Sequence, residues 1–230
     1  MRFDDYDTGG FYDEMFDEQG RPRPGNEAVV QRFSELTLDE LKTRQHAAEK
    51  ALLKMGITFS VYGDEQGAER IFPFDIVPRI IAGSEWVTIE AGLKQRVQAL
   101  NLFIDDIYHE QRIVKDGVIP AELIASASGF RKECLGLKPP CGIWCHVTGT
   151  DLVRGGDGRF YVLEDNLRCP SGVSYVLENR VVMKRSFPRA FDAAGVLPVS
   201  DYPNRLLELL QSLASPRGDK PVVAVWTPGI

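Results

Sequence analysis

The chain has 230 residues, of which 43% are hydrophobic and 26% are charged, proportions that are ordinary for a folded globular protein. Its formal net charge of −6 and the lack of a Lys/Arg run argue against general nucleic-acid binding, which needs a basic surface. No stretch approaches the ~18 apolar residues of a membrane span, and the acidic N-terminus lacks the apolar core of a signal peptide. We therefore expect a cytoplasmic protein without a membrane partner.

The N-terminal part of the chain begins without a clear periodic pattern. Residues 1–36 are polar and punctuated by Gly and Pro, but their scattered aromatic residues predict an irregular arm that docks on the body. Thr37 and Glu40 have the spacing of a capping box, in which each satisfies a free backbone N–H of the other. The helix that follows is expected to end before Gly56, a residue type that favours the position after a helix.

The remaining predicted elements are, in chain order, a strand over 57–62, an extended segment over 71–81, helices over 91–111 and 120–127, strands over 142–154 and 159–166, helices over 178–193 and 204–213, and a strand over 222–226. Helices precede strands rather than alternating with them, which favours an α+β or mixed α/β fold over a doubly wound sheet. The sequence thus divides into the arm, a mainly helical part over 37–140 and a β-hairpin-containing part over 141–230.

The cysteines indicate no metal-thiolate site. Cys134, Cys141, Cys145 and Cys169 form no CxxC pair, and we expect them to be reduced and mostly buried thiols. His146 has the residue type of a general base, but a single histidine on a predicted strand is more often structural.

The predicted hairpin carries the candidate site. Its strands are joined by the Gly-Gly-Asp-Gly run at 155–158, whose residues tolerate positive φ. A symmetric turn of two or four residues places Asp151 opposite Val162, so that Asp151, Glu164 and Asn166 share one face. A three-residue loop or a bulge reverses this arrangement, and the sequence leaves both possibilities open.

The residue types on this face suit a hard divalent cation. Two carboxylates and an amide oxygen are ligands that Mg²⁺ accepts, with water and phosphate completing its shell. The segment that follows offers the Arg168 guanidinium, the Ser171 hydroxyl and the backbone at Gly172 as candidate phosphate contacts. Alternating polar residues on a strand can equally form a solvated face, so the pattern alone does not decide between the two readings.

Longer motifs carry a resemblance to a known family. The segments GTDLVR and VLEDNLRCPSGVSYVLENR, together with FDIVPRII, ALNLFIDDIYHEQRIVKDGVIP and the final VVAVWTPG, closely resemble the circularly permuted ATP-grasp type 2 family. Its members are distantly similar to glutathionylspermidine synthetase and eukaryotic glutathione synthetase. The resemblance implies that Asp151, Glu164 and Asn166 bind the Mg²⁺ of Mg-ATP. It also implies that Arg168, Ser171 and Gly172 contact phosphate, with Arg168 as the catalytic candidate.

The resemblance further implies an activity. ATP-grasp enzymes join a carboxylate to an amine through an acyl phosphate, so the expected partners are small-molecule or peptide carboxylate and amine substrates, with ATP and Mg²⁺ as cofactors. Members of the family are about twice as long as this chain, and no glycine-rich loop with a nearby Lys is evident here. We therefore expect an ATP-grasp-like partial fold, with N-terminal helices and a mainly antiparallel sheet, that is truncated at the C-terminus. The missing C-terminal half or a second copy of the chain could complete it.

Two other functions remain open. A truncated, non-catalytic module would bind a partner or nucleotide without turnover, and a metal-dependent hydrolase could use the same carboxylates. Substrate identity is not encoded in any motif, since the arginines that could bind a substrate carboxylate could equally form surface salt bridges. These arginines are Arg79, Arg96, Arg112 and Arg131.

Overall fold

The computed structural model describes residues 3, 5–60, 69–168, 170–214 and 221–225. The chain forms two compact units, which are considered separately below. Three elements contribute residues to both units, namely the long helix α3 (Gly83–Tyr108) and the two strands of one hairpin, β3 (Gly149–Arg154) and β4 (Phe160–Asn166). No helix in the described ranges is long and apolar enough to cross a membrane.

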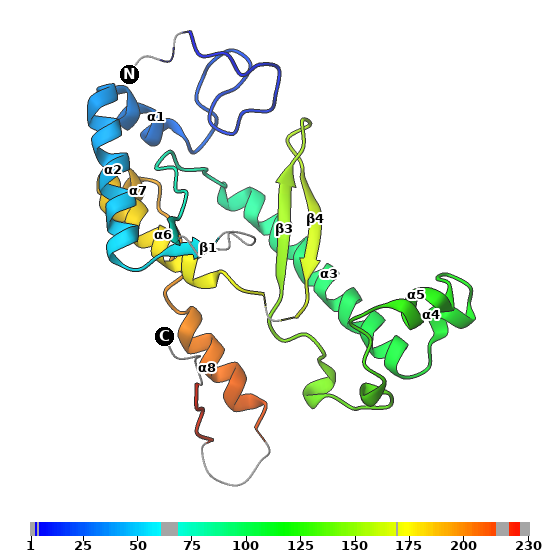
Figure 1. Ribbon diagram of the computed structural model, residues 1–230. Coiled ribbons are helices and arrows are strands. Elements are labelled where there is room, and N and C mark those ends of the chain that lie inside the picture. Colours follow the sequence, from blue (N-terminus) through cyan, green and yellow to red (C-terminus); the bar gives the residue numbers. More distant parts are fainter. Residues whose placement is uncertain (1–2, 4, 61–68, 169, 215–220, 226–230) are drawn as a thin grey trace. The chain divides into compact units, whose positions relative to one another are not determined.

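The first unit comprises the described parts of Met1–Trp86, Val153–Tyr161 and Ser171–Ser200. Its further elements are α1 (Glu27–Ser34), α2 (Leu38–Lys54), the antiparallel strands β1 (Thr58–Ser60) and β2 (Glu69–Ile71), α6 (Val173–Ser186) and α7 (Pro188–Ala193). Helix α2 lies along α6, and α1 packs against α7, which brings segments far apart in sequence together (Figure 1).

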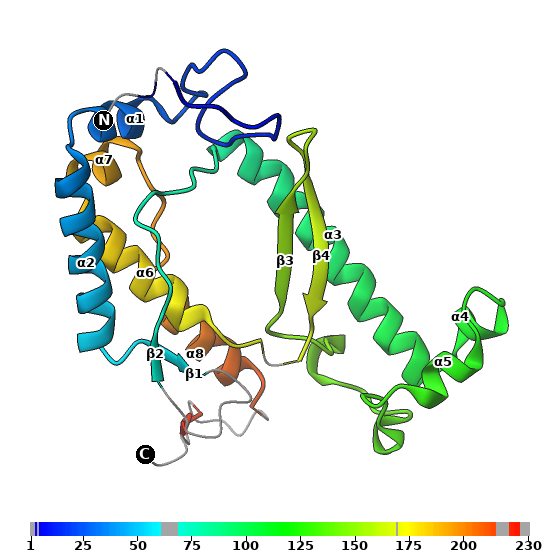
Figure 2. The same ribbon diagram turned by 45° about the horizontal axis from the view of Figure 1, so that its top comes forward.

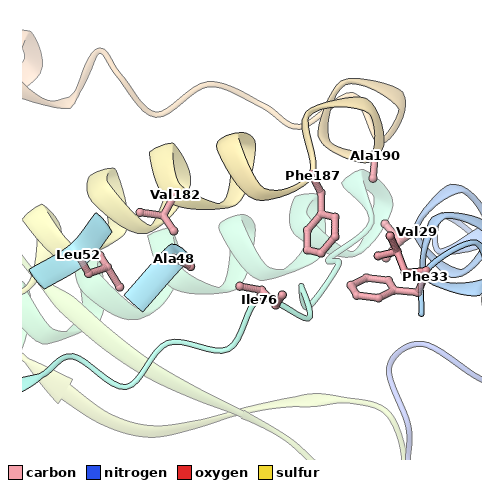
Figure 3. Packing of buried hydrophobic residues seen from close by; sticks show 9 residues of the cluster. Val29, Phe33, Ala48, Leu52, Ile76, Val182, Phe187 and Ala190 are labelled. Carbon is pink, nitrogen blue, oxygen red and sulfur yellow. The ribbon is translucent and has the colours of Figure 1, made fainter. Parts of the chain in front are cut away.

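Helix α2 begins as the sequence predicts. Thr37 Oγ1 accepts a hydrogen bond from the Glu40 N–H (3.2 Å), and Glu40 Oε2 accepts one from the Thr37 N–H (2.8 Å), so the capping box is confirmed. The buried face of α2 presents Ala48 and Leu52 to Val182 of α6 (Figure 3). Burying one such Leu side chain stabilises the fold by about 2 kcal/mol.

The same core continues toward α1 and α7. Phe33 of α1 packs against Phe187, with ring centroids 4.9 Å apart, and Val29 and Ala190 lie in the same cluster (Figure 3). Helix α1 lies within the segment that the sequence predicts to be irregular. The helix has only eight residues, too few to be stable by itself, and packing of Val29, Val30 and Phe33 on the core stabilises it.

The single helix predicted over 178–193 is divided into α6 and α7. The break falls at Phe187, whose φ of −138° and ψ of 63° are not helical. Pro188 explains this conformation, because a proline disfavours the helical region for the residue before it and readily occupies the first turn of the next helix. Helix α6 also begins five residues earlier than predicted, directly after Gly172.

The second unit comprises the described parts of Val87–Leu152, Val162–Pro170 and Asp201–Ile230. Besides its share of α3 and of the hairpin, it contains α4 (Arg112–Lys115), α5 (Ala121–Ser126), the 3₁₀ turns η1 (Lys132–Cys134) and η2 (Pro140–Gly142), and α8 (Tyr202–Ser212). Tyr108, at the end of α3, is stacked between Phe130 and Trp144, with centroid separations of 5.1 and 4.9 Å.

The strand predicted over 142–154 begins only at Gly149. The reason lies in α3, because Asn101 Oδ1 accepts hydrogen bonds from the backbone N–H groups of Trp144 and Cys145, each at 2.9 Å. Trp144 Nε1 also donates to Asp105 Oδ1 (2.9 Å). These side-chain partners replace the neighbouring strand that backbone donors would otherwise need.

The predicted fold class is confirmed, since helices are combined with antiparallel strand pairs, seen for β3 and β4 in Figure 2. The prediction of a strand over 222–226 is wrong for residues 222–225, which form no strand and leave Val222 94% and Val225 80% exposed. Trp226 and the end of the strand predicted over 57–62 lie outside the described residues.

Candidate metal and nucleotide site

The turn of the hairpin sets the register at one end of β3 and β4. The Gly155 N–H donates to the carbonyl of Arg159 (2.8 Å), and the Gly158 N–H donates to the carbonyl of Gly155 (2.9 Å). With a φ of +77° at Gly158, this pattern is a three-residue loop that ends in a G1 bulge. The symmetric turn assumed from the sequence is therefore wrong, and Gly155 rather than Arg154 lies opposite Arg159.

A second irregularity lies further along β4. Thr150 Oγ1 donates to Asp165 Oδ1 (3.0 Å), and a Cβ added to Gly149 would lie 3.9 Å from the Asn166 Cβ. These contacts pair Gly149 with Asn166, one residue further along β4 than the turn alone dictates. Strand β4 thus gains one residue relative to β3 between its two ends, as a β-bulge produces.

The loop and the bulge each shift the pairing by one residue, so beyond the bulge the residues of β4 lie on the same faces as a symmetric turn predicts. Leu163 and Glu164 are consecutive exposed residues of β4, whereas the Asp165 side chain is 9% exposed. By strand alternation, Asp151, Glu164 and Asn166 lie together on the exposed face of the hairpin. Asn166 Nδ2 donates to Glu164 Oε1 (2.9 Å), so these two side chains are in direct contact. Their assignment as metal ligands stays a prediction.

Asp165 projects from the opposite face and is fully engaged there. Its Oδ1 accepts from Thr150, and its Oδ2 lies 2.7 Å from both Nε and Nη2 of Arg96, a residue of α3. A carboxylate whose two oxygens both accept hydrogen bonds from the protein is poorly available to bind a metal ion. The exposed face is left with Asp151 and Glu164 as its carboxylates.

The predicted phosphate contacts follow β4 in sequence. Arg168 is exposed and makes no hydrogen bond or ion pair with other residues in the described part of the chain. Ser171 and Gly172 precede α6, where Gly172 is the N-cap at a φ of +98° and no side chain caps the helix. The first N–H groups of a helix that lacks such a cap are open to an anion. Cys169 lies outside the described residues.

The other metal-binding residue types are not gathered into a site. Within the described ranges, no three His, Cys, Asp or Glu side chains lie close enough to hold a metal ion. The predicted set of two carboxylates and one amide does not need such a group, because Mg²⁺ usually binds one or two carboxylates and keeps water or phosphate oxygens as its other ligands.

The cysteines differ from expectation in their burial. Cys134, Cys141 and Cys145 are free thiols, but Cys141 is exposed and the other two are half-buried, so the prediction of mostly buried thiols is wrong. Burial raises the pKa of the Cys145 thiol, which keeps it neutral. His146 Nε2 is buried and makes no hydrogen bond to the residues that the structure describes.

The sequence gives no signal for the ion-pair network at the tip of the hairpin. The Arg154 side chain is 6% exposed and binds Glu14 (2.6 Å), Glu85 (2.7 Å) and the Gly158 carbonyl (2.8 Å). Its guanidinium also lies 4.0 Å from the centroid of the Phe160 ring, a cation–π contact. Glu14 is 140 residues from Arg154 in the chain, and no local sequence pattern can predict a contact over that separation.

The charges of this network shift the ionisation of its acids. The Arg79 guanidinium, hydrogen-bonded to Glu14, lowers the pKa of that carboxyl, and Arg154 acts in the same direction. The hydrogen bond from Arg154 likewise lowers the pKa of Glu85. Three of the arginines considered as substrate contacts are thus paired with acids, as Arg79 with Glu14, Arg96 with Asp165 and Arg112 with Glu110.

Comparison with known proteins places the sequence in a family. Residues 78–230 match the family described as circularly permuted ATP-grasp type 2. An uncharacterised protein of Synechocystis sp. is 55% identical over the whole of this chain, which covers 48% of that protein. An uncharacterised protein of Mycobacterium leprae is 45% identical over 99% of this chain and 41% of its own length.

A third relative bears a functional name. A protein of Frankia alni called "Putative glutamate--cysteine ligase 2-3" is 42% identical over 95% of this chain, which corresponds to 25% of that protein. The chain therefore spans about half the length, or less, of the curated relatives that it matches. Since the family match covers more than half of the sequence and includes the whole hairpin, the chain belongs to the circularly permuted ATP-grasp type 2 family.

Proposed function

We propose that the chain is the metal- and ATP-binding part of an ATP-grasp ligase, which joins a carboxylate to an amine. Membership of the ATP-grasp family implies the use of ATP and typically of Mg²⁺. In this proposal Asp151, Glu164 and Asn166 hold the metal, and Arg168, Ser171 and Gly172 contact phosphate. The remaining walls of the site come from the part of the longer relatives that this chain does not match, or from a second copy.

The observation that carries the proposal is the exposed face of the hairpin. It presents two carboxylates and an amide, with Asn166 bonded to Glu164, while the intervening Asp165 is directed away and engaged by Arg96 and Thr150. An oxygen-rich, solvent-exposed face of this kind suits Mg²⁺ that is also bound to water and phosphate. The guanidinium of Arg168, which is exposed and has no partner among the described residues, supports a role in phosphate binding, for which guanidinium geometry is well suited.

The proposed chemistry needs no side-chain nucleophile. Mg-ATP supplies a phosphoryl group to the substrate carboxylate, which forms an acyl phosphate and releases ADP, and an amine then displaces phosphate to form the amide. The residues of this chain orient the phosphates and neutralise their charge, which is the main contribution of a protein to phosphoryl transfer. The ligase name of the Frankia relative supports a peptide-type product. Because ATP and reduced thiols coexist in the cytoplasm, we place the reaction there.

Calorimetric titration with ATP in the presence and absence of Mg²⁺ tests the site in the longest natural form of the protein. We expect Mg²⁺-dependent ATP binding that Glu164→Gln weakens by about tenfold or more, because one anionic ligand is lost. Glu122→Gln is the matched control, since it removes the same charge from an exposed position on α5 that has no described bonding partner.

Three results would contradict the proposal in different ways. Mg²⁺-independent binding, or an unchanged affinity for Glu164→Gln, would remove the hairpin from the site. Binding without ADP formation when carboxylates and amines are supplied would favour a non-catalytic module. Release of phosphate from a phosphoester without an amine acceptor would favour a metal-dependent hydrolase.

A further inference from the structure

The strand that carries Glu164 and Asn166 has an intrinsically weak register. A two-stranded ribbon is only marginally stable by itself, and the contacts at the two ends of the hairpin, together with the consecutive exposed residues Leu163 and Glu164, indicate a bulge in β4. Because side chains alternate between faces, a slip of one residue would turn Glu164 and Asn166 inward and Asp165 outward. The hairpin turn fixes the register at one end only, so a contact beyond the bulge is needed to fix which face these residues occupy.

Asp165 makes that contact on the inward face. It lies between the two predicted ligands in sequence, and its side chain is 9% exposed. Thr150 of the neighbouring strand donates to Oδ1, which ties Asp165 across the hairpin. Arg96 of α3 donates to Oδ2 through Nε and approaches the same oxygen with Nη2, so the carboxylate is held from a separate element. A charge-assisted pair of this geometry is stronger than a neutral hydrogen bond.

Arg96 also balances charge near the proposed metal site. Without the Arg96 guanidinium, Asp165 would be a third carboxylate of the hairpin that, like Asp151 and Glu164, has no ion pair among the described residues. A poorly exposed charge without a partner is costly. The one-residue slip described above would relieve that cost, because it would turn Asp165 toward solvent. The ion pair thus opposes the one rearrangement that would exchange Asp165 for Glu164 and Asn166 on the exposed face.

We infer that Arg96 is a positioning residue of the metal site: by binding Asp165 on the inward face, it holds Glu164 and Asn166 on the exposed face. The inference rests on the proposed function for its consequence in metal binding. Its structural part, the fixing of the β4 register, stands on the contacts of Asp165 and can be measured without metal.

The first experiment compares amide hydrogen exchange of the metal-free protein across 160–166. Arg96→Gln is expected to accelerate exchange in this strand, whereas Arg96→Lys, which keeps a cation beside Asp165, is expected to restore part of the protection. Lys94→Gln is the matched control, because it removes a positive charge from the same helix, where Lys94 pairs with Glu90 one turn away and with no other residue that the structure describes. Thermal unfolding of each variant shows whether the effect is local.

The second experiment measures Mn²⁺ binding by electron paramagnetic resonance, with ATP present, in the longest natural form of the protein. We expect Arg96→Gln to weaken Mn²⁺ binding by roughly tenfold, as is typical when a residue that orients metal ligands is lost. The Mn²⁺ affinity of Arg96→Lys should lie between those of Arg96→Gln and the unchanged protein. Lys94→Gln should bind Mn²⁺ as tightly as the unchanged protein does.

The outcomes separate this inference from the proposed function. If the unchanged protein binds Mn²⁺ and Glu164→Gln does not, but Arg96→Gln matches Lys94→Gln in both exchange and affinity, the positioning role is overturned and the metal site stands. If the unchanged protein binds no Mn²⁺, the proposed function fails and the role of Arg96 in metal binding fails with it. Faster exchange in Arg96→Gln would then still support its hold on the register of β4.

Discussion

Gly158 determines the shape of the hairpin turn through two separate constraints. Its φ of +77° is a backbone conformation that costs other L-residues about 1–2 kcal/mol, and a Cβ there would lie 2.5 Å from the Tyr12 ring. We expect Gly158→Ala to lower the free energy of unfolding by about 2 kcal/mol or more, measured by urea denaturation. Gly156→Ala is the control, because it changes the same turn at a position with open space. Equal losses for the two variants would contradict this account.

Glu14 should make the stability of the first unit sensitive to acid. Its pKa is lowered in the folded protein, so its ion pairs with Arg79 and Arg154 stabilise the fold above the ordinary glutamate pKa of about 4.3. That stabilisation is lost as the pH falls through the lower folded-state pKa. We expect Glu14→Gln to lower the melting temperature at pH 7, and we expect the difference from the unchanged protein to shrink as the pH falls below about 4.3. Glu18→Gln, which alters an exposed arm residue without a described pair, should show neither effect. A constant difference between pH 7 and pH 3 would exclude this role.

At the scale of an element, the capping box of α2 links a sequence signal to a measurable energy. Thr37 is both predicted and observed as the N-cap, with its side chain and that of Glu40 satisfying each other's backbone N–H groups. We expect Thr37→Ala to cost about 1 kcal/mol of stability, whereas Thr37→Ser should retain most of it. Urea denaturation of the three proteins tests this, and a Thr37→Ser variant as unstable as Thr37→Ala would point to lost methyl packing instead.

The elements show which parts of the fold a sequence can predict. Helix α2 has its start signal, its apolar face and its stop within one continuous segment, so local physics is sufficient. The late start of β3 depends on Asn101, more than forty residues away, which binds the backbone of Trp144. A contact of this kind cannot be recognised in the local pattern, which therefore predicts a strand that begins seven residues too early.

The candidate site was predictable in part for the same reason. Its residue types and spacing are local, and they also carry the family resemblance. A symmetric turn predicts that Asp151 and Glu164 share one face, but the structure has a three-residue loop instead. The Gly-Gly-Asp-Gly run is compatible with several loop lengths, and the sequence of β4 contains no signal for a bulge. The agreement arises because the turn and the bulge each shift the register by one residue.

At the scale of the whole molecule, the described chain leaves many large apolar side chains in contact with solvent. Phe11 is 81% exposed, Leu163 on the face of the proposed site is 68% exposed, and Val222 is 94% exposed. Soluble monomers seldom leave extensive apolar surface uncovered, and such surface commonly marks a site of interaction. The chain also spans about half the length of its Synechocystis relative. The described residues thus leave large apolar side chains available for contact with other molecules.

We therefore expect the 230-residue chain by itself to bind the dye ANS and to self-associate with rising concentration, as sedimentation velocity would show. Apolar side chains that lack partners within the chain drive both effects. Co-expression with the part of the Synechocystis relative that this chain does not match should reduce both, because the two proteins are 55% identical over the matched part and their contact residues should be largely compatible. An unrelated protein of equal size is the control for simple crowding. A chain that stays monomeric and binds no dye at every concentration would show that its exposed apolar residues need no covering. If co-expression with the unrelated protein also reduces self-association of the chain, the effect is not specific to the family.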